Sequence, residues 1–204
     1  MKLSLGFKGQ RNYIQGGDIF NSLSDLAPHL TGDPDASIAS LAFRTFARSG
    51  CFVVGERPSP DVKLIAQAQL AYHDPHDPDH LKTRDVWVVE GQEVITDRRA
   101  FDEEALLAPS VTDRDAMSCK LPQRSVYTPI EDLIALTKHL HYALFPDING
   151  KWLFAQIDLT HPLRETYKQS EIILKKCVAG RFSVSEIVID GQTIGMMRFI
   201  VGNP

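Results

Sequence analysis

Two segments of the chain, Val86–Phe101 (VWVVEGQEVITDRRAF) and Ser185–Val201 (SEIVIDGQTIGMMRFIV), follow the same pattern. In each, two apolar runs flank an acidic residue and a glycine, which is typical of two strands joined by a tight turn. The identical pairs are Val88/Val188, Gly91/Gly191, Gln92/Gln192 and Arg98/Arg198, at a constant offset of 100 residues. An internal repeat constrains the architecture more than a single motif does. We therefore predict two related halves, each ending in a hairpin.

An amphipathic helix is predicted ahead of each hairpin. Apolar residues recur at helical spacing over Asp18–Ala27, where Pro28 is expected to end the helix. The sequence Thr128-Pro129-Ile130-Glu131 forms a capping box, and we expect the second helix over Pro129–Phe145. Asp18 then matches Asp132 at an offset of 114 residues, so the first half contains 14 additional residues between helix and hairpin.

The remaining segments define the predicted boundaries. Strands are expected over Ser40–Val54 (one bent strand or two), Val62–Tyr72, Lys151–Leu159 and Ser170–Val178. The stretch Asp102–Gln123 is charged, irregular and contains two prolines. We therefore predict a first unit over residues 1–101, a linker over residues 102–123 and a second unit over residues 124–204.

Composition narrows the class of protein. A hydrophobic content of 43% and a charged content of 24% are typical of a soluble globular chain. The net charge of −4, without a run of basic residues, argues against nucleic acid or an anionic membrane as a partner. Three cysteines without CxxC spacing indicate reduced thiols and a cytoplasmic location. We expect neither a signal peptide nor a membrane-spanning segment.

A unit of about a hundred residues, with one central helix followed by a curled antiparallel sheet, resembles the hotdog fold. Two such units resemble a double hotdog, and this resemblance covers most of the chain through element order and the repeat. It implies an α+β fold class, in which each sheet wraps its helix and the two units pair side by side to cover edge strands. It also implies acyl thioesters of coenzyme A or acyl carrier protein as ligands, without a cofactor, and leaves a homodimer open.

In hotdog proteins a helix N-terminus directs backbone N–H groups at the thioester carbonyl, and an Asp, Glu or His provides acid–base chemistry. The matching residues are Tyr13, Gly16, Gly17 and Asp18 in the first half, and Tyr127, Glu131 and Asp132 in the second. Asp18 and Asp132 are the candidate bases, although a capping role also fits Asp18. The tyrosines are candidates for substrate binding or for local packing, and Glu131 also fits the capping box.

Two histidine-containing features have alternative interpretations. His141 shares a helix face with Ile134 and Leu144, so it is a candidate catalytic residue or a buried neutral histidine. The segment His73–His80 (HDPHDPDH) contains metal-ligand side chains. Its prolines favour an extended loop in which neighbouring ligands point apart, so we predict a solvated loop and no metal site.

The predicted reaction is hydrolysis of an acyl thioester by a water molecule that Asp18 or Asp132 activates. A non-catalytic hotdog module for binding or scaffolding remains an alternative. A 3-hydroxyacyl thioester dehydratase is a further alternative. Such dehydratases place a histidine just before the helix, whereas Asn12–Gly17 contains none.

Overall fold

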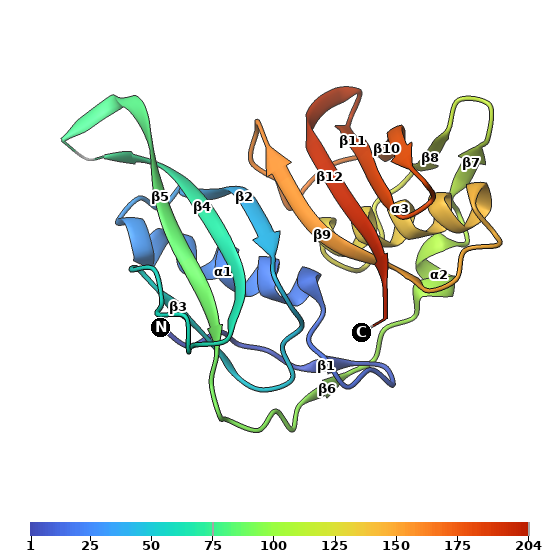
Figure 1. Ribbon diagram of the computed structural model, residues 1–204. Helices are drawn as coiled ribbons and strands as arrows, with labels where there is room; N and C mark the ends of the chain where they lie inside the picture. The colour runs from blue at the N-terminus through green and yellow to red at the C-terminus, as the bar shows by residue number, and fades with distance from the viewer. Residues whose placement is uncertain (75, 204) are drawn as a thin grey trace. The chain divides into compact units, whose positions relative to one another are not determined.

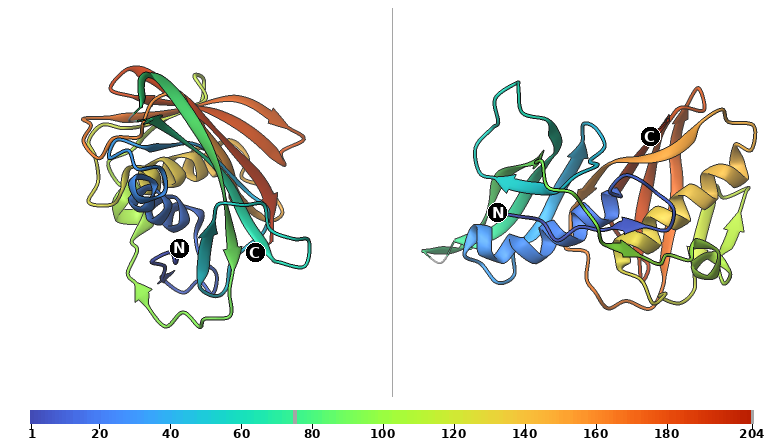
Figure 2. Two further views of the ribbon diagram at one scale, coloured as in Figure 1. Left: turned by 90° about the vertical axis from the view of Figure 1, so that its left-hand side faces the viewer. Right: turned by 90° about the horizontal axis from the view of Figure 1, so that it is seen from below.

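The computed structural model describes residues 1–74 and 76–203, which form two compact units, Met1–Phe101 and Asp102–Pro204 (Figure 1). Each unit combines one 16-residue helix with an antiparallel sheet. In the views of Figure 2, each of these helices lies along one face of its own sheet. The α+β class predicted from the sequence is therefore confirmed. Among the described residues, no helix combines the length and the apolar character that crossing a membrane requires.

The first unit contains α1 and a four-stranded sheet. Its elements are β1 (Phe7–Lys8), α1 (Gly16–Thr31), β2 (Ser37–Phe43), β3 (Cys51–Val54), β4 (Leu64–Asp74), β5 (Asp77–Glu90) and β6 (Arg98–Arg99). The sheet order is β3-β5-β4-β2, with every neighbouring pair antiparallel. The short strands β1 and β6 form a separate parallel pair.

Helix α1 extends beyond its predicted end. Pro28 lies inside the last turn, and the helix continues to Thr31. Gly32 ends it with a left-handed φ of 82°, and its N–H donates to the Pro28 carbonyl at 2.8 Å. Proline removes one backbone donor but leaves its own carbonyl free to accept, so a helix can continue for a few residues past it before a glycine cap. The prediction that Pro28 ends the helix was wrong.

The second unit has a larger sheet. Its elements are α2 (Glu103–Leu107), β7 (Val111–Asp113), β8 (Ser118–Leu121), α3 (Pro129–Leu144), β9 (Lys151–Leu159), β10 (Ser170–Val178), β11 (Phe182–Ile189) and β12 (Gln192–Gly202). The strand order is β9-β12-β11-β10-β8-β7, and all neighbouring pairs are antiparallel.

The stretch Asp102–Gln123, predicted as an irregular linker, is structured and belongs to the second unit. The Asp102 carboxylate caps α2 by accepting from the Ala105 N–H at 3.0 Å. Strand β8 pairs with β10, and its side chains Cys119 and Leu121 are fully buried. Elements of three to five residues contain too few turns or alternations to produce a periodic signal.

The start of α3 agrees with its sequence. The Thr128 N–H donates to the Glu131 carboxylate at 2.8 Å, as expected of the capping box. Its apolar stripe is completely buried, and the members are Ile130, Leu133, Leu136 and Leu140. The helix ends at Leu144, just before Pro146.

Only the second copy of the repeated segment is a hairpin. Strands β11 and β12 pair across Asp190-Gly191, whose φ angles of 51° and 84° are both left-handed, as such a tight turn requires. In the first copy, β5 ends at Glu90 and the chain leaves the sheet, and the next strand, β6, pairs only with β1. The predicted hairpin at Val86–Phe101 was therefore wrong.

Contacts with residues distant in the sequence explain why the chain leaves the sheet after Glu90. The Glu90 carboxylate accepts from the backbone N–H groups of Arg48 and Ser49 and pairs with Lys63 at 2.5 Å. A Cβ at Gly91 would lie 2.4 Å from the Phe52 ring. Gly91 is thus required for close packing, whereas Gly191 is required for a left-handed turn.

The two sheets nevertheless share an arrangement. Counted from the strand that follows the long helix, β5 and β11 both occupy the third place in their sheets. In the second unit, the second place is taken by β12, the strand that follows β11 in the chain. In the first unit, it is taken by β4, the strand that precedes β5. The matching sequences therefore occupy corresponding places, while the order of the last two strands is exchanged.

The different roles of the two glycines predict different responses to substitution. We expect Gly91→Ala to lower the free energy of unfolding by about 1–3 kcal/mol through overpacking against Phe52. We expect Gly191→Ala to cost about 1–2 kcal/mol through left-handed strain. Urea unfolding measures both. A Phe52→Ala background should recover most of the loss at Gly91 and none of the loss at Gly191, and equal recovery at both positions would contradict these roles.

Candidate functional site

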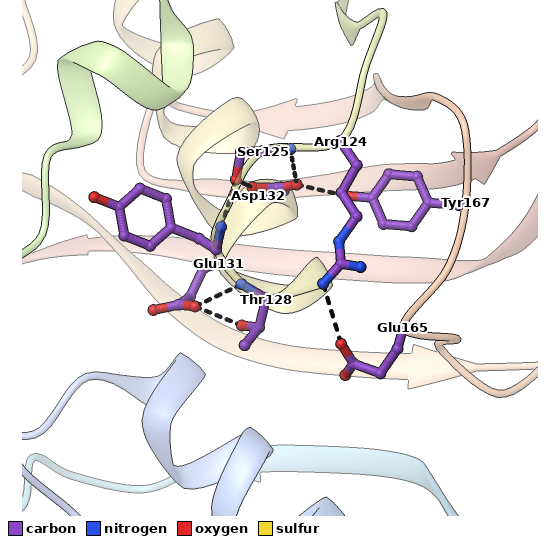
Figure 3. A network of polar contacts seen from close by, with 8 residues as sticks. Arg124, Ser125, Thr128, Glu131, Asp132, Glu165 and Tyr167 are labelled. Carbon is purple, nitrogen blue, oxygen red and sulfur yellow. Dashed lines mark hydrogen bonds and ion pairs between the residues drawn. The ribbon is translucent and has the colours of Figure 1, made fainter.

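A cluster of polar side chains surrounds the first turn of α3 (Figure 3). We call Arg124, Ser125, Asp132, Glu165 and Tyr167 the Asp132 cluster. Arg124 and Ser125 precede α3, Asp132 belongs to its first turn, and the other two lie in the loop between β9 and β10. Three separate segments of the second unit therefore meet at this helix N-terminus.

Hydroxyl groups bind both oxygens of the Asp132 carboxylate. The Ser125 hydroxyl donates to Oδ1 at 2.5 Å, and the Tyr167 hydroxyl donates to Oδ2 at 2.5 Å. The Ser125 backbone N–H adds a third bond to Oδ2 at 3.3 Å. Asp132 is completely buried. Short, charge-assisted bonds of this kind fix the orientation of a carboxylate.

The surroundings oppose ionisation of Asp132 overall. Burial raises its pKa, and hydrogen bonds from Ser125 and Tyr167, together with the charge of Arg124, offset only part of that increase. Burial and the neighbouring carboxylate raise the pKa of Tyr167 in turn. Among the described residues, no lysine or arginine forms an ion pair with Asp132. A carboxylate with a raised pKa and hydroxyl partners is suited to accept a proton.

Two other candidates from the second half make local contacts. The Glu131 carboxylate accepts from both the N–H and the hydroxyl of Thr128, at 2.8 Å and 2.6 Å. The Tyr127 hydroxyl accepts from the Asp102 N–H at 2.9 Å. These contacts stabilise the start of α3 and the start of the unit. Their predicted role in substrate binding stays a prediction.

The corresponding acid of the first unit has a different neighbour. Asp18 and Lys8 are both buried, and their side chains form an ion pair at 2.7 Å. Gly16 and Gly17 form the first turn of α1, and the N-cap residue Gln15 makes no side-chain capping bond there. The Tyr13 ring packs edge-on against Phe46, with centroids 5.1 Å apart.

His141 does not belong to the Asp132 cluster. It lies nine residues further along α3, roughly 13 Å away at the helical rise. Its ring packs on Trp152 with centroids 4.2 Å apart and meets Phe199 edge-on at 5.5 Å. Neither ring nitrogen has a hydrogen-bond partner among the described residues. Burial lowers its pKa to about 4, so His141 is a neutral core residue at pH 7.

The segment His73–His80 is mostly strand rather than loop, because β4 continues to Asp74 and β5 begins at Asp77. Pro75 lies outside the described residues. Contacts near this tip join His80 to Asp77 and Lys82 to Asp74, each at 2.7 Å. Among the residues whose side chains the structure describes, no group of three His, Cys, Asp or Glu is arranged to hold a metal ion.

Ser125, Arg124 and Tyr167 were not predicted as site residues. Tyr167 is 35 positions from Asp132, in a loop that carries no periodic pattern. Its partner can be identified only when β9 and β10 are placed beside α3. Ser125 is closer in sequence, but a serine before a capping box has no distinctive signal.

Comparison with known proteins identifies the fold. No protein-family model matches the chain, and no curated protein matches its sequence. The dehydratase domain of PpsC from Mycobacterium tuberculosis, solved in complex with C12:1-CoA, superposes with a TM-score of 0.50 at 10% identity, covering 93% of this chain and 85% of that domain. The tesB protein of Mycobacterium avium subspecies paratuberculosis gives a TM-score of 0.49 at 9% identity, with 98% and 92% covered. The chain is thus similar in structure to hotdog-fold proteins, and its fold is a hotdog fold.

The burial of His141 predicts acid sensitivity. The unfolded state binds a proton with a pKa near 6.5, whereas the folded state binds it only near pH 4. Folded stability from this residue is therefore complete above pH 6.5 and decreases as the pH falls towards 4, by on the order of 3 kcal/mol. Urea unfolding at pH 7.0 and pH 4.5 should show this loss in the wild type.

The matched variants are His141→Phe, which keeps an aromatic ring beside Trp152, and His139→Gln on the same helix. His141→Phe should be less sensitive to acid, while His139→Gln should behave like the wild type. An unchanged difference between the two pH values in His141→Phe would disprove the assignment.

Proposed function

We propose that this chain is a tandem hotdog protein that binds acyl thioesters of coenzyme A or acyl carrier protein and hydrolyses them, with Asp132 as general base. The observation that carries the proposal is a buried carboxylate in the first turn of a central helix, bound by two hydroxyls at 2.5 Å. Such a carboxylate can take a proton from a neighbouring hydroxyl without first breaking an ion pair. The PpsC dehydratase domain, which shares the fold, was solved with an acyl-CoA, and this supports the ligand class.

The tandem arrangement is supported by the content of each unit. Both have a 16-residue helix followed by four strands in one antiparallel sheet. Strands β5 and β11 carry the similar sequences and occupy corresponding places. Duplication followed by an exchange of the last two strands accounts for the similarity and the difference. The boundary between the proposed domains lies at residue 101, with residues 102–123 included in the second.

The proposed reaction uses Ser125 as a proton relay. Asp132 has no exposed surface, but Ser125 is only partly buried and binds Oδ1 directly. A water molecule gives a proton to the Ser125 hydroxyl as that hydroxyl passes its own proton to Asp132. The resulting hydroxide attacks the thioester carbonyl, and the tetrahedral intermediate expels the thiolate. The proton on Asp132 returns to the thiolate, so one water and one thioester yield an acid and a thiol.

A helix N-terminus stabilises the negative charge that develops on the carbonyl oxygen. For Gly16 and Gly17, in the first turn of α1, this role stays a prediction from the sequence. Asp18 is the weaker candidate base, because its carboxylate already pairs with the buried Lys8 ammonium. A proton transfer to Asp18 would leave that ammonium buried without its counter-ion.

A non-catalytic binding module is the second candidate. The complete burial of Asp132, with both oxygens bonded, favours it, since a purely structural cluster would show the same geometry. A dehydratase receives less support, because His141 lies roughly 13 Å along α3 from Asp132 and is buried among aromatic rings.

Hydrolysis of a panel of acyl-CoA substrates, followed by thiol release, tests the proposal. Asp132→Asn should lower kcat by about 100-fold or more, because the amide cannot accept the relayed proton. Asp25→Asn is a matched control on the exposed side of α1 and should retain wild-type activity. Thermal melting establishes that both variants are folded.

The outcomes separate the two candidates. Turnover that persists at wild-type rate in folded Asp132→Asn would rule out this residue as the base. Binding of acyl-CoA without turnover of any substrate by the wild type would identify the chain as a binding module.

A further inference from the structure

Arg124 is the cationic member of the Asp132 cluster. It directly precedes Ser125, and its positive charge offsets part of the increase that burial causes in the pKa of Asp132 and of Tyr167. Its side chain remains 32% exposed. In Figure 3 the Arg124 side chain extends from the segment before α3 towards Glu165, and part of it is accessible to solvent.

The ion pair that Arg124 makes is weak in geometry. One terminal nitrogen, Nη2, contacts Glu165 Oε2 at 3.3 Å, and the Glu165 side chain is 73% exposed. The Nε atom is buried and has no hydrogen-bond partner among the described residues. Paired guanidinium and carboxylate groups are most strongly bound when two parallel N–H bonds form at about 2.7–2.9 Å. The Arg124 pair has one longer bond instead.

Another ion pair of the second unit shows the contrast. Lys138 and Glu103 meet at 2.5 Å, with only 20% and 26% of their side chains exposed, and this contact joins α2 to α3. The Arg124–Glu165 pair joins only the exposed loop between β9 and β10 to the cluster. Exposed pairs of this kind contribute little to stability and exchange readily with other ions.

We infer that Arg124 is an anion-binding subsite of the Asp132 cluster, at which a substrate phosphate or carboxylate replaces the Glu165 side chain. The inference rests on the proposed function and assigns Arg124 to an oxyanion of its substrate. The planar fork of guanidinium N–H donors can bind a carboxylate or phosphate through two parallel hydrogen bonds. The contact with Glu165 uses only one such bond. The anion could be the phosphate of a phosphopantetheine arm or a carboxylate on the acyl group, which share this chemistry.

Calorimetric titration of the full chain with non-hydrolysable thioether analogues tests the inference without requiring turnover. One arm compares butyryl-phosphopantetheine with butyryl-pantetheine analogues, which differ only in the phosphate. The other compares succinyl-pantetheine with butyryl-pantetheine analogues, which differ in the acyl carboxylate. We expect the wild type to prefer the anionic member by about tenfold in one arm, which identifies the source of the anion.

Three variants test the roles assigned to Arg124 and Glu165. Arg124→Gln should abolish the preference and leave the affinity for butyryl-pantetheine unchanged. Glu165→Gln should tighten binding of the anionic analogue by roughly threefold or more, because the internal competitor is removed. Arg124→Lys, which keeps the charge but loses the fork, should retain only part of the preference.

Equal affinity for anionic and neutral analogues in both arms, or no binding of any analogue, would overturn the inference. A Glu165→Gln variant that weakens anion binding would also overturn it, because the glutamate would then assist rather than compete. Wild-type melting temperatures in the variants exclude misfolding as the cause of a lost preference. An anion preference without any acyl-CoA hydrolysis would reject the hydrolase and retain the subsite.

Discussion

Each unit depends on one helix that covers one face of an antiparallel sheet. In the second unit, the buried stripe of Leu133, Leu136 and Leu140 packs against strands that contribute Trp152 and Phe199 to the same core. Burial of large apolar side chains is the main favourable term in folding, so this contact fixes where α3 begins and which of its faces points inward. Asp132 lies one turn from the start of that helix, and the same packing that buries the leucines removes its carboxylate from water.

A buried carboxylate must be compensated, and the two units do so in different ways. Lys8 supplies a cation to Asp18, whereas Ser125 and Tyr167 supply hydroxyls to Asp132. An ammonium stabilises the ionised form strongly, while hydroxyls orient the carboxylate without neutralising it. Two acids in the first turns of the two long helices therefore have different chemical capacities. This difference is the physical basis for assigning the proposed chemistry to the second unit.

The sequence predicted the features that depend on local contacts. The capping box before α3, the helical stripe of α1 and the turn at Asp190-Gly191 all involve residues within about one turn of each other, so their patterns are visible in the chain. The prediction of a corresponding turn at Glu90-Gly91 was wrong. Contacts from Arg48, Ser49 and Phe52, about forty residues away, determine the path of the chain there.

The sequence alone determined the fold class, the two long helices and the position of an acid in the first turn of each. Helical periodicity and capping depend on residues that are close in the sequence, so both can be recognised in the sequence alone. The tertiary structure decided the order of the strands beside each long helix, and it decided that α2, β7 and β8 occupy the segment predicted as a linker. It also decided that Tyr167, 35 residues from Asp132, completes the cluster. These features depend on contacts between distant segments, and such contacts follow from the burial of the whole sheet rather than from any local pattern.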